Sequence, residues 1–160
     1  MIELALTHYN AFKFVHVLSA VVWVGGACTV QVYALLATRT NDPLRVAAFA
    51  KDTEFVGTRI FLPSSLILLV SGIFTLHDSS GLWSFGQGWV QFGLVVIALS
   101  IVVGAGYLGP ESGRIARATE AKGVESPEVQ ERIQRIFLVS RVELVLLLAV
   151  VFDMVVKPGM

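Results

Sequence analysis

The amino-acid sequence predicts an all-α, polytopic membrane protein: a four transmembrane helix bundle that forms a single domain over residues 1–160. Of its residues 55% are hydrophobic and 15% are charged, and the mean hydropathy is +0.74. Soluble domains carry roughly 25% charged residues. The composition therefore excludes a water-soluble fold and a disordered chain. Separate apolar stretches reach the length of about 20 residues that a helix needs to cross the hydrocarbon core.

The first two predicted spans cover about residues 9–37 and 57–77. No charged residue lies between Lys13 and Arg39, so the first span is long enough to cross the bilayer with tilt. The second span contains Pro63 near its start. A proline there removes no helical hydrogen bond if the helix begins shortly before it.

The third and fourth predicted spans cover about residues 88–109 and 136–156. The fourth is the least apolar of the set, because Arg141, Glu143 and Asp153 interrupt it. Ser126 followed by Pro127 resembles a helix start. We therefore expect one continuous helix from the preceding loop through the fourth span.

The distribution of Lys and Arg predicts the orientation, because basic loops stay in the cytoplasm. The loop from His77 to Gln87 has no Lys or Arg. The other two loops hold the basic residues Arg39, Arg45, Lys51, Arg114, Arg117, Lys122, Arg132 and Arg135. We expect a multi-pass protein of a bacterial inner membrane, with the N-terminus and the C-terminus outside.

The net charge of the chain and the small residues in its spans limit the partners that we expect for this protein. The 12 Lys and Arg residues balance 12 Asp and Glu residues, so a nucleic acid is not an expected partner. The lipid bilayer is the expected environment. The spacings Ser100/Gly104 and Ala105/Gly109 allow close helix approach, which is compatible with a homodimer.

Polar residues in the outer half of the bilayer suggest one site that draws on every span. Ionisable side chains are costly in hydrocarbon and usually face the bundle interior. By helical rise the members of this site are His16, His77, Gln91 and Asp153, with Lys157 above them. Two structural alternatives remain open: His16 bonding to a backbone carbonyl, and Asp153 pairing with Lys157 at i,i+4.

The inner half has a second polar set, formed by Arg59, Arg141 and Glu143. Arg141 and Glu143 are two residues apart and do not face each other on a helix. We expect Arg141 to snorkel to the cytoplasmic interface. Glu143 is then expected to pair with Arg59 across two helices.

Two short motifs resemble known membrane families. The segment Lys13-Phe14-Val15-His16-Val17-Leu18, with Trp23 and Gly25-Gly26 after it, is similar to the first helix of HemJ-type proteins. The ending Val155-Val156-Lys157-Pro158 is similar to their terminal signature. Both motifs also resemble a family of predicted integral membrane proteins of about this length with no assigned function, and the first helix resembles the copper-resistance CopD membrane domain.

The HemJ resemblance implies a b-type haem, protoporphyrinogen oxidation and an axial ligand at His16. The HemJ pattern has a Lys after the third-helix Trp, where this chain has Gln91 after Trp89, and it has a histidine in the stretch that here reads Gly106-Tyr107-Leu108. These departures leave open whether the protein is an enzyme.

The leading hypothesis is therefore a protein that binds haem b or a porphyrin, with His16 as the metal ligand. His77 or Met154 is the candidate for a second axial position. A porphyrin or a quinone would be the redox partner. The alternatives are a non-catalytic assembly subunit of a membrane complex and a transporter for a metal or a small solute.

Overall fold

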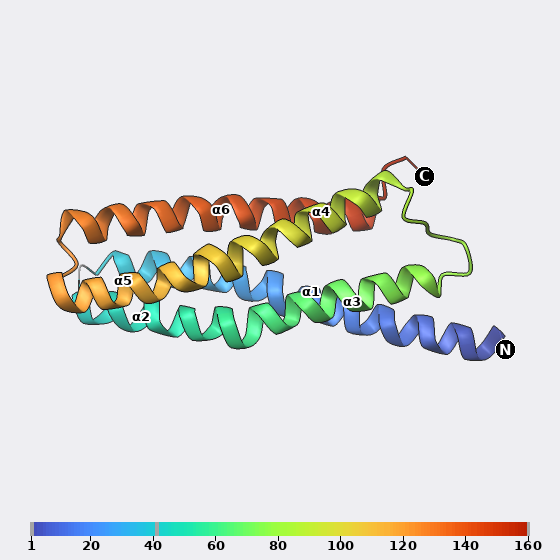
Figure 1. The fold of residues 1–160 in the computed structure, drawn as a ribbon, viewed down its shortest axis with the longest axis horizontal. Helices are drawn as coiled ribbons and strands as arrows, with labels where there is room; N and C mark the ends of the chain where they lie inside the picture. Colours follow the sequence, from blue (N-terminus) through green and yellow to red (C-terminus); the bar gives the residue numbers. More distant parts are fainter. Residues whose placement is uncertain (1, 41, 160) are drawn as a thin grey trace.

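The computed structural model describes residues 2–40 and 42–159, with side chains from His8 onward. The described chain is helical apart from its turns and loops, and its first helix, α1, runs over Ile2–Thr38. Figure 1 shows a long bundle in which both termini lie at the same end. The all-α prediction is confirmed.

Two further long helices are each built from three consecutive segments. One consists of α2 (Pro43–Val56), the π-helical turn η1 (Gly57–Phe61) and α3 (Leu62–His77). The other consists of α4 (Gly88–Val103), the π-helical turn η2 (Gly104–Leu108) and α5 (Gly109–Lys122). The chain ends in α6, Pro127–Val156.

The second and third long helices extend beyond the apolar stretches into segments that we expected to be loops. The second helix begins at Pro43, where Asp42 caps it by accepting a hydrogen bond from the backbone N–H of Leu44 at 3.0 Å. Segments expected as cytoplasmic loops therefore form α2 and α5, which pack against each other. Val46 and Ile115 are buried in that contact.

The expected helix start just before Pro63 was wrong. Pro63 follows a π-helical turn in which the N–H of Leu62 donates to the carbonyl of Gly57, five residues back. Pro110 stands in the same position after η2, where the N–H of Gly109 donates to the carbonyl of Gly104. A proline ring clashes with the carbonyl four residues before it in a regular helix. A wider π turn at each proline reduces that conflict.

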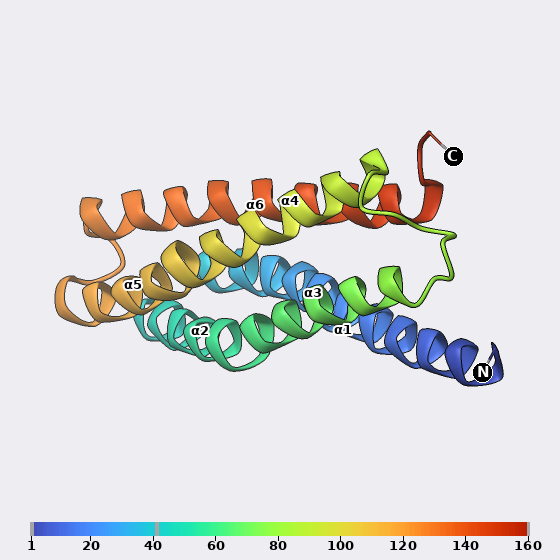
Figure 2. The same ribbon diagram turned by 45° about the vertical axis from the view of Figure 1, so that its right-hand side comes forward.

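Three of the long helices have the length and apolar composition of a membrane span, over His8–Thr38, Pro43–His77 and Gly88–Lys122. The fourth, α6, is not among them, because its second half carries Arg141, Glu143 and Asp153. It nevertheless begins at Ser126-Pro127 as predicted and runs unbroken to Val156. Figure 2 shows α6 lying along the rest of the bundle.

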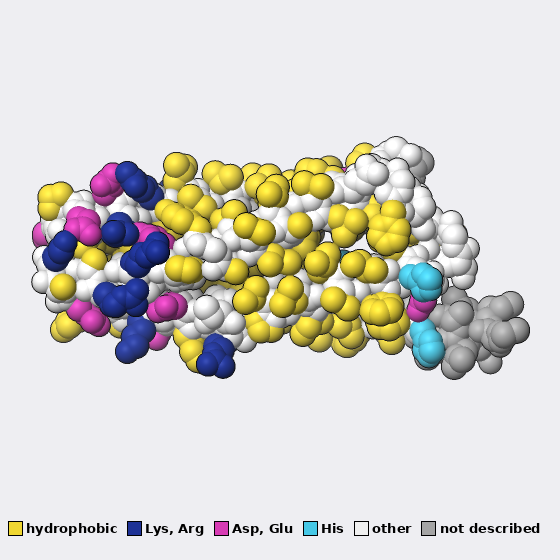
Figure 3. All heavy atoms as spheres, viewed as in Figure 1, with side chains coloured by type: hydrophobic (Ala, Val, Ile, Leu, Met, Phe, Trp, Pro, Cys, Tyr) yellow, Lys and Arg dark blue, Asp and Glu magenta, His cyan; other side chains and the backbone are white. Residues whose placement is uncertain are grey.

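The surface separates into an apolar belt and a charged end. Figure 3 shows hydrophobic side chains over the middle of the bundle, while Lys, Arg, Asp and Glu gather at the end with the α1–α2 and α5–α6 connections. Exposed Leu66, Val95 and Val145 lie in the belt. A continuous apolar belt of this kind fits a hydrocarbon environment.

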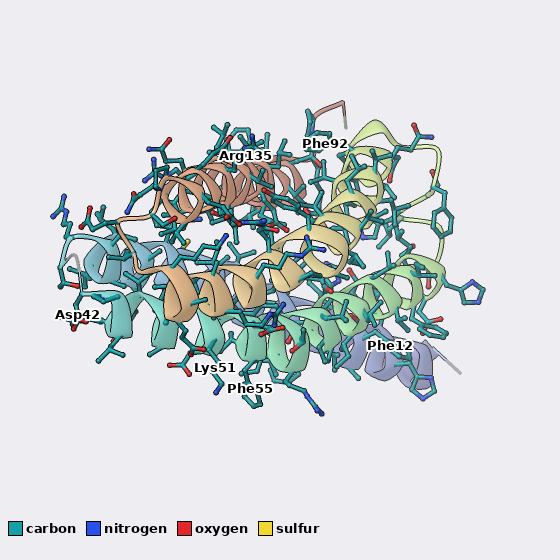
Figure 4. The ribbon with its side chains drawn as sticks, turned by 60° about the vertical axis from the view of Figure 1, so that its left-hand side comes forward. Phe12, Asp42, Lys51, Phe55, Phe92 and Arg135 are labelled. Atoms are coloured by element: carbon teal, nitrogen blue, oxygen red, sulfur yellow. The ribbon has the colours of Figure 1, made fainter. Side chains whose placement is uncertain are left out.

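Two clusters of buried side chains form the core. The central cluster joins Trp23 of α1, Leu68 of α3, Ile97 of α4 and Leu147 of α6. The second lies at the charged end, between α2, α5 and the start of α6, and includes Val129. Figure 4 places Asp42 at the charged end and Phe12 at the opposite one. The middle of the bundle and its charged end are therefore held by different sets of helices.

Candidate functional site

The imidazole of His16 lies between α1 and α3. Its Nδ1 is 2.8 Å from the carbonyl oxygen of Leu68. A carbonyl only accepts, so Nδ1 carries the hydrogen and Nε2 holds a free lone pair. Among the described residues, Nε2 has no hydrogen-bond partner. His16 is therefore bonded to a backbone carbonyl, as one alternative expected, and it keeps one ring nitrogen free.

A glycine makes room for this ring. A Cβ placed on Gly72 would lie 2.9 Å from Cε1 and 3.0 Å from Nδ1 of His16, closer than real side chains come. Ser71, next to Gly72, donates its hydroxyl hydrogen to the carbonyl of Ile67 at 2.6 Å, and its Oγ lies 3.2 Å from the Leu68 carbonyl oxygen. The position of the imidazole is therefore set by α3 as much as by α1.

The other outer residues do not gather around His16. His77 is exposed at the end of α3, and Gln91 is exposed near the start of α4. Met154 of α6 lies against Gly93 of α4, in a different helix pair from His16. Of the three candidate iron ligands, the structure places only His16 between α1 and α3. His77 and Met154, the candidates for the second axial position, do not lie beside it.

Asp153 and Lys157 do not form the expected ion pair. Lys157 ends α6 in a left-handed conformation, with φ 48° and ψ 64°, which turns its side chain off the helix face. Its ammonium lies 3.7 Å from the ring centroid of Trp83 and 5.6 Å from that of Trp89. Asp153 is buried, and its Oδ2 has no partner among the described residues.

The inner pair expected between Glu143 and Arg59 is also absent from the described part of the chain. Arg59 is exposed on η1, whereas the half-buried Glu143 lines a partly open cavity between the helices. Arg141 is exposed, and its guanidinium lies 5.6 Å from the ring of Phe137, one turn closer to the charged end. That direction agrees with the expected snorkelling of Arg141.

Ion pairs tie α5 to α6 at the charged end. Glu111, buried on α5, accepts hydrogen bonds from Nη1 of Arg132 at 2.6 Å and from Nη1 of Arg114 at 3.1 Å.

Two further ion pairs lie at the surface of this end. Lys122 pairs with Glu128 across the α5–α6 connection. The hydrogen bond from Lys122 lowers the pKa of Glu128. Arg135 and Glu131 form an exposed pair along α6.

Metal ligands do not cluster in the described part of the chain: no three His, Cys, Asp or Glu side chains come together there. Cys28, which is half-buried, is a free thiol. Any metal bound at His16 would therefore have to bring most of its own ligands, as the macrocycle of a haem does.

Sequence reasoning did not find the cavity beside Glu143. Its walls come from residues far apart in the chain, so no local pattern marks it. The available signal was Glu143 itself, because an acidic side chain inside a span usually faces a polar partner or a water-filled space.

The apolar belt, the charged end and the long helices define a helical integral membrane protein. The chain belongs to the family described as predicted integral membrane protein (DUF2269), which matches residues 10–158. No curated protein and no solved structure matches the chain. The resemblance to a family of predicted membrane proteins is confirmed, whereas the likeness to HemJ-type and CopD proteins rests on the short motifs alone.

Proposed function

We propose that this membrane protein binds a b-type haem or a related porphyrin in the outer half of the bundle, with Nε2 of His16 as an axial ligand. The observation that carries the proposal is the 2.8 Å hydrogen bond from Nδ1 to the Leu68 carbonyl. Histidines that bind metals usually donate their other ring N–H to a carbonyl or a carboxylate. That bond fixes the tautomer and the ring orientation.

The residues around His16 fit a single axial bond. Phe12 and Phe74 stack 4.8 Å apart on the same two helices, nearer the outer end. A bound haem would supply one-electron chemistry, and the chain itself would hold and orient the iron ligand. A porphyrin or a quinone as reaction partner, and a homodimer, belong to the same proposal.

The test is the visible spectrum of the protein purified in detergent from haem-replete cells, oxidised and then reduced with dithionite. We expect a Soret band that sharpens with α and β bands on reduction, and haem stoichiometry by pyridine haemochrome assay. His16→Ala should lose this spectrum, because it removes the axial nitrogen. His77→Ala should keep it, because that ring is exposed at the end of α3. A colourless wild-type protein, or an unchanged spectrum in His16→Ala, would reject the proposal.

A further inference from the structure

A cavity of about 140 Å³ lies in the inner half of the bundle, away from His16. Residues of every helix line it, from Trp23 on α1 to Leu147 on α6. It lies between the two core clusters, since members of both contribute to its wall. An engineered apolar cavity of about 150 Å³ admits benzene, so this one is large enough for a single ring.

Both π-helical turns border the cavity. Gly57 and Phe61 of η1 face it, as do Gly104, Ala105 and Leu108 of η2. A Cβ built on Gly104 would meet no atom within 4 Å. A Cβ built on Gly57 would also meet no atom within 4 Å, so each π-helical turn has a glycine with open space beside it.

The wall combines one carboxylate with aromatic rings. Glu143 is the one ionisable side chain among the described residues that line the cavity. It has no ion-pair or hydrogen-bond partner among the described residues. The aromatic residues of the wall are Trp23, Phe49, Phe61 and Phe137. Aromatic faces attract cations, and a carboxyl group in a low-dielectric interior stays ionised only where a counter-charge or a hydrogen-bond donor stabilises it.

The hydroxyl groups in the wall add acceptors. Thr53, Ser65 and Ser112 each donate their only hydroxyl hydrogen to a carbonyl of their own helix, at 2.8 to 2.9 Å. A hydroxyl that has used its hydrogen can only accept from a ligand. These three hydroxyls and Glu143 can therefore accept from a ligand that donates hydrogen bonds, while Gln31 in the same wall carries an amide that can donate.

We propose that this cavity binds a small organic cation, a protonated amine on an apolar or aromatic body, with the ammonium on Glu143 and the body among the aromatic rings. This site is separate from His16 and does not depend on haem binding. Neutral molecules of the same shape would bind more weakly, because they cannot form the ion pair with the ionised form of Glu143.

The experiment measures binding of benzylammonium and of neutral benzyl alcohol to the detergent-purified protein at neutral pH by titration calorimetry. We expect wild type to bind benzylammonium more tightly than benzyl alcohol. Glu143→Gln should weaken benzylammonium binding by roughly tenfold or more, because both the charge pair and the cation orientation are lost. The same variant should leave benzyl alcohol binding nearly unchanged.

A second pair of variants tests the cavity independently of Glu143. Gly104→Leu fills the open space beside η2 and should abolish binding of both probes. Gly106→Leu is its matched control, because Gly106 belongs to the same turn, does not line the cavity and has no atom within 4 Å of a built Cβ. Equal wild-type affinity for the two probes, full benzylammonium binding by Glu143→Gln, or binding unaffected by Gly104→Leu would each overturn the proposal.

Discussion

At the scale of single residues, the backbone carbonyl of Leu68 fixes the imidazole of His16 between α1 and α3. It accepts a hydrogen bond from His16 Nδ1 at 2.8 Å. A polar His16 on an apolar span was visible in the sequence, and its depth followed from helical rise. Its partner was not visible, because a main-chain carbonyl on another helix has no sequence signature. The i,i+4 spacing allowed Lys157 to pair with Asp153, but the left-handed backbone at Lys157 places its ammonium over Trp83 instead.

Gly72 provides a residue-scale test of this arrangement. We expect Gly72→Ala to destabilise the protein, because its Cβ would lie 2.9 Å from Cε1 of a hydrogen-bonded ring. Overpacking of this kind costs about 1–3 kcal/mol, which exceeds the gain of up to about 1 kcal/mol from replacing glycine in a helix. The measurement is the midpoint of unfolding in a mixed-micelle SDS titration. Gly25→Ala is the control, because a Cβ on Gly25 meets no atom within 4 Å. Equal stability of the two variants would contradict the close packing of His16 against Gly72.

At the scale of elements, composition predicted the apolar parts of the helices and missed their polar extensions. The segments that form α2 and α5 carry charged residues of the charged end, so their hydropathy resembles that of loops. Their helical form depends on their mutual packing and on contacts with α6. The π turns were missed for a related reason: Pro63 and Pro110 mark an interruption, but whether a helix bends, widens or ends there depends on its neighbours.

The contact between α5 and α6 gives a prediction about an element. Arg132→Gln should lower the free energy of unfolding clearly, because Glu111 then loses the shorter of its two ionic hydrogen bonds and keeps only the one from Arg114. Arg135→Gln, one turn along α6 at the exposed Glu131 pair, should change it by less than about 0.5 kcal/mol. SDS titration of both variants under identical conditions measures the difference. A loss no larger for Arg132→Gln than for Arg135→Gln would show that Glu111 does not hold these helices together.

The whole molecule is polarised along its axis, and this was the most predictable of its features. The Lys and Arg residues of the loops predicted that two connections lie on the same side of the membrane. The structure places these two, α1–α2 and α5–α6, at the same charged end of the bundle. At the other end Trp83 and Trp89 meet edge to face at 5.4 Å, under the Lys157 ammonium. Aromatic residues of this kind favour the membrane–water interface. The cavity could not be predicted at this scale, because it exists only where distant segments fail to fill the space between them.

This polarity predicts the orientation in the membrane. In a Cys28→Ser background, Ser84→Cys in the α3–α4 connection should react with a membrane-impermeant maleimide in intact cells, because the connection without Lys or Arg is expected outside. Glu125→Cys, equally exposed in the α5–α6 connection, should react only after the cells are opened. Since His16 lies toward the Ser84 end and Glu143 toward the Glu125 end, the same pair also assigns a side of the membrane to each proposed site. Labelling of Glu125→Cys in intact cells, with Ser84→Cys protected, would reverse both assignments and place the His16 site on the cytoplasmic side.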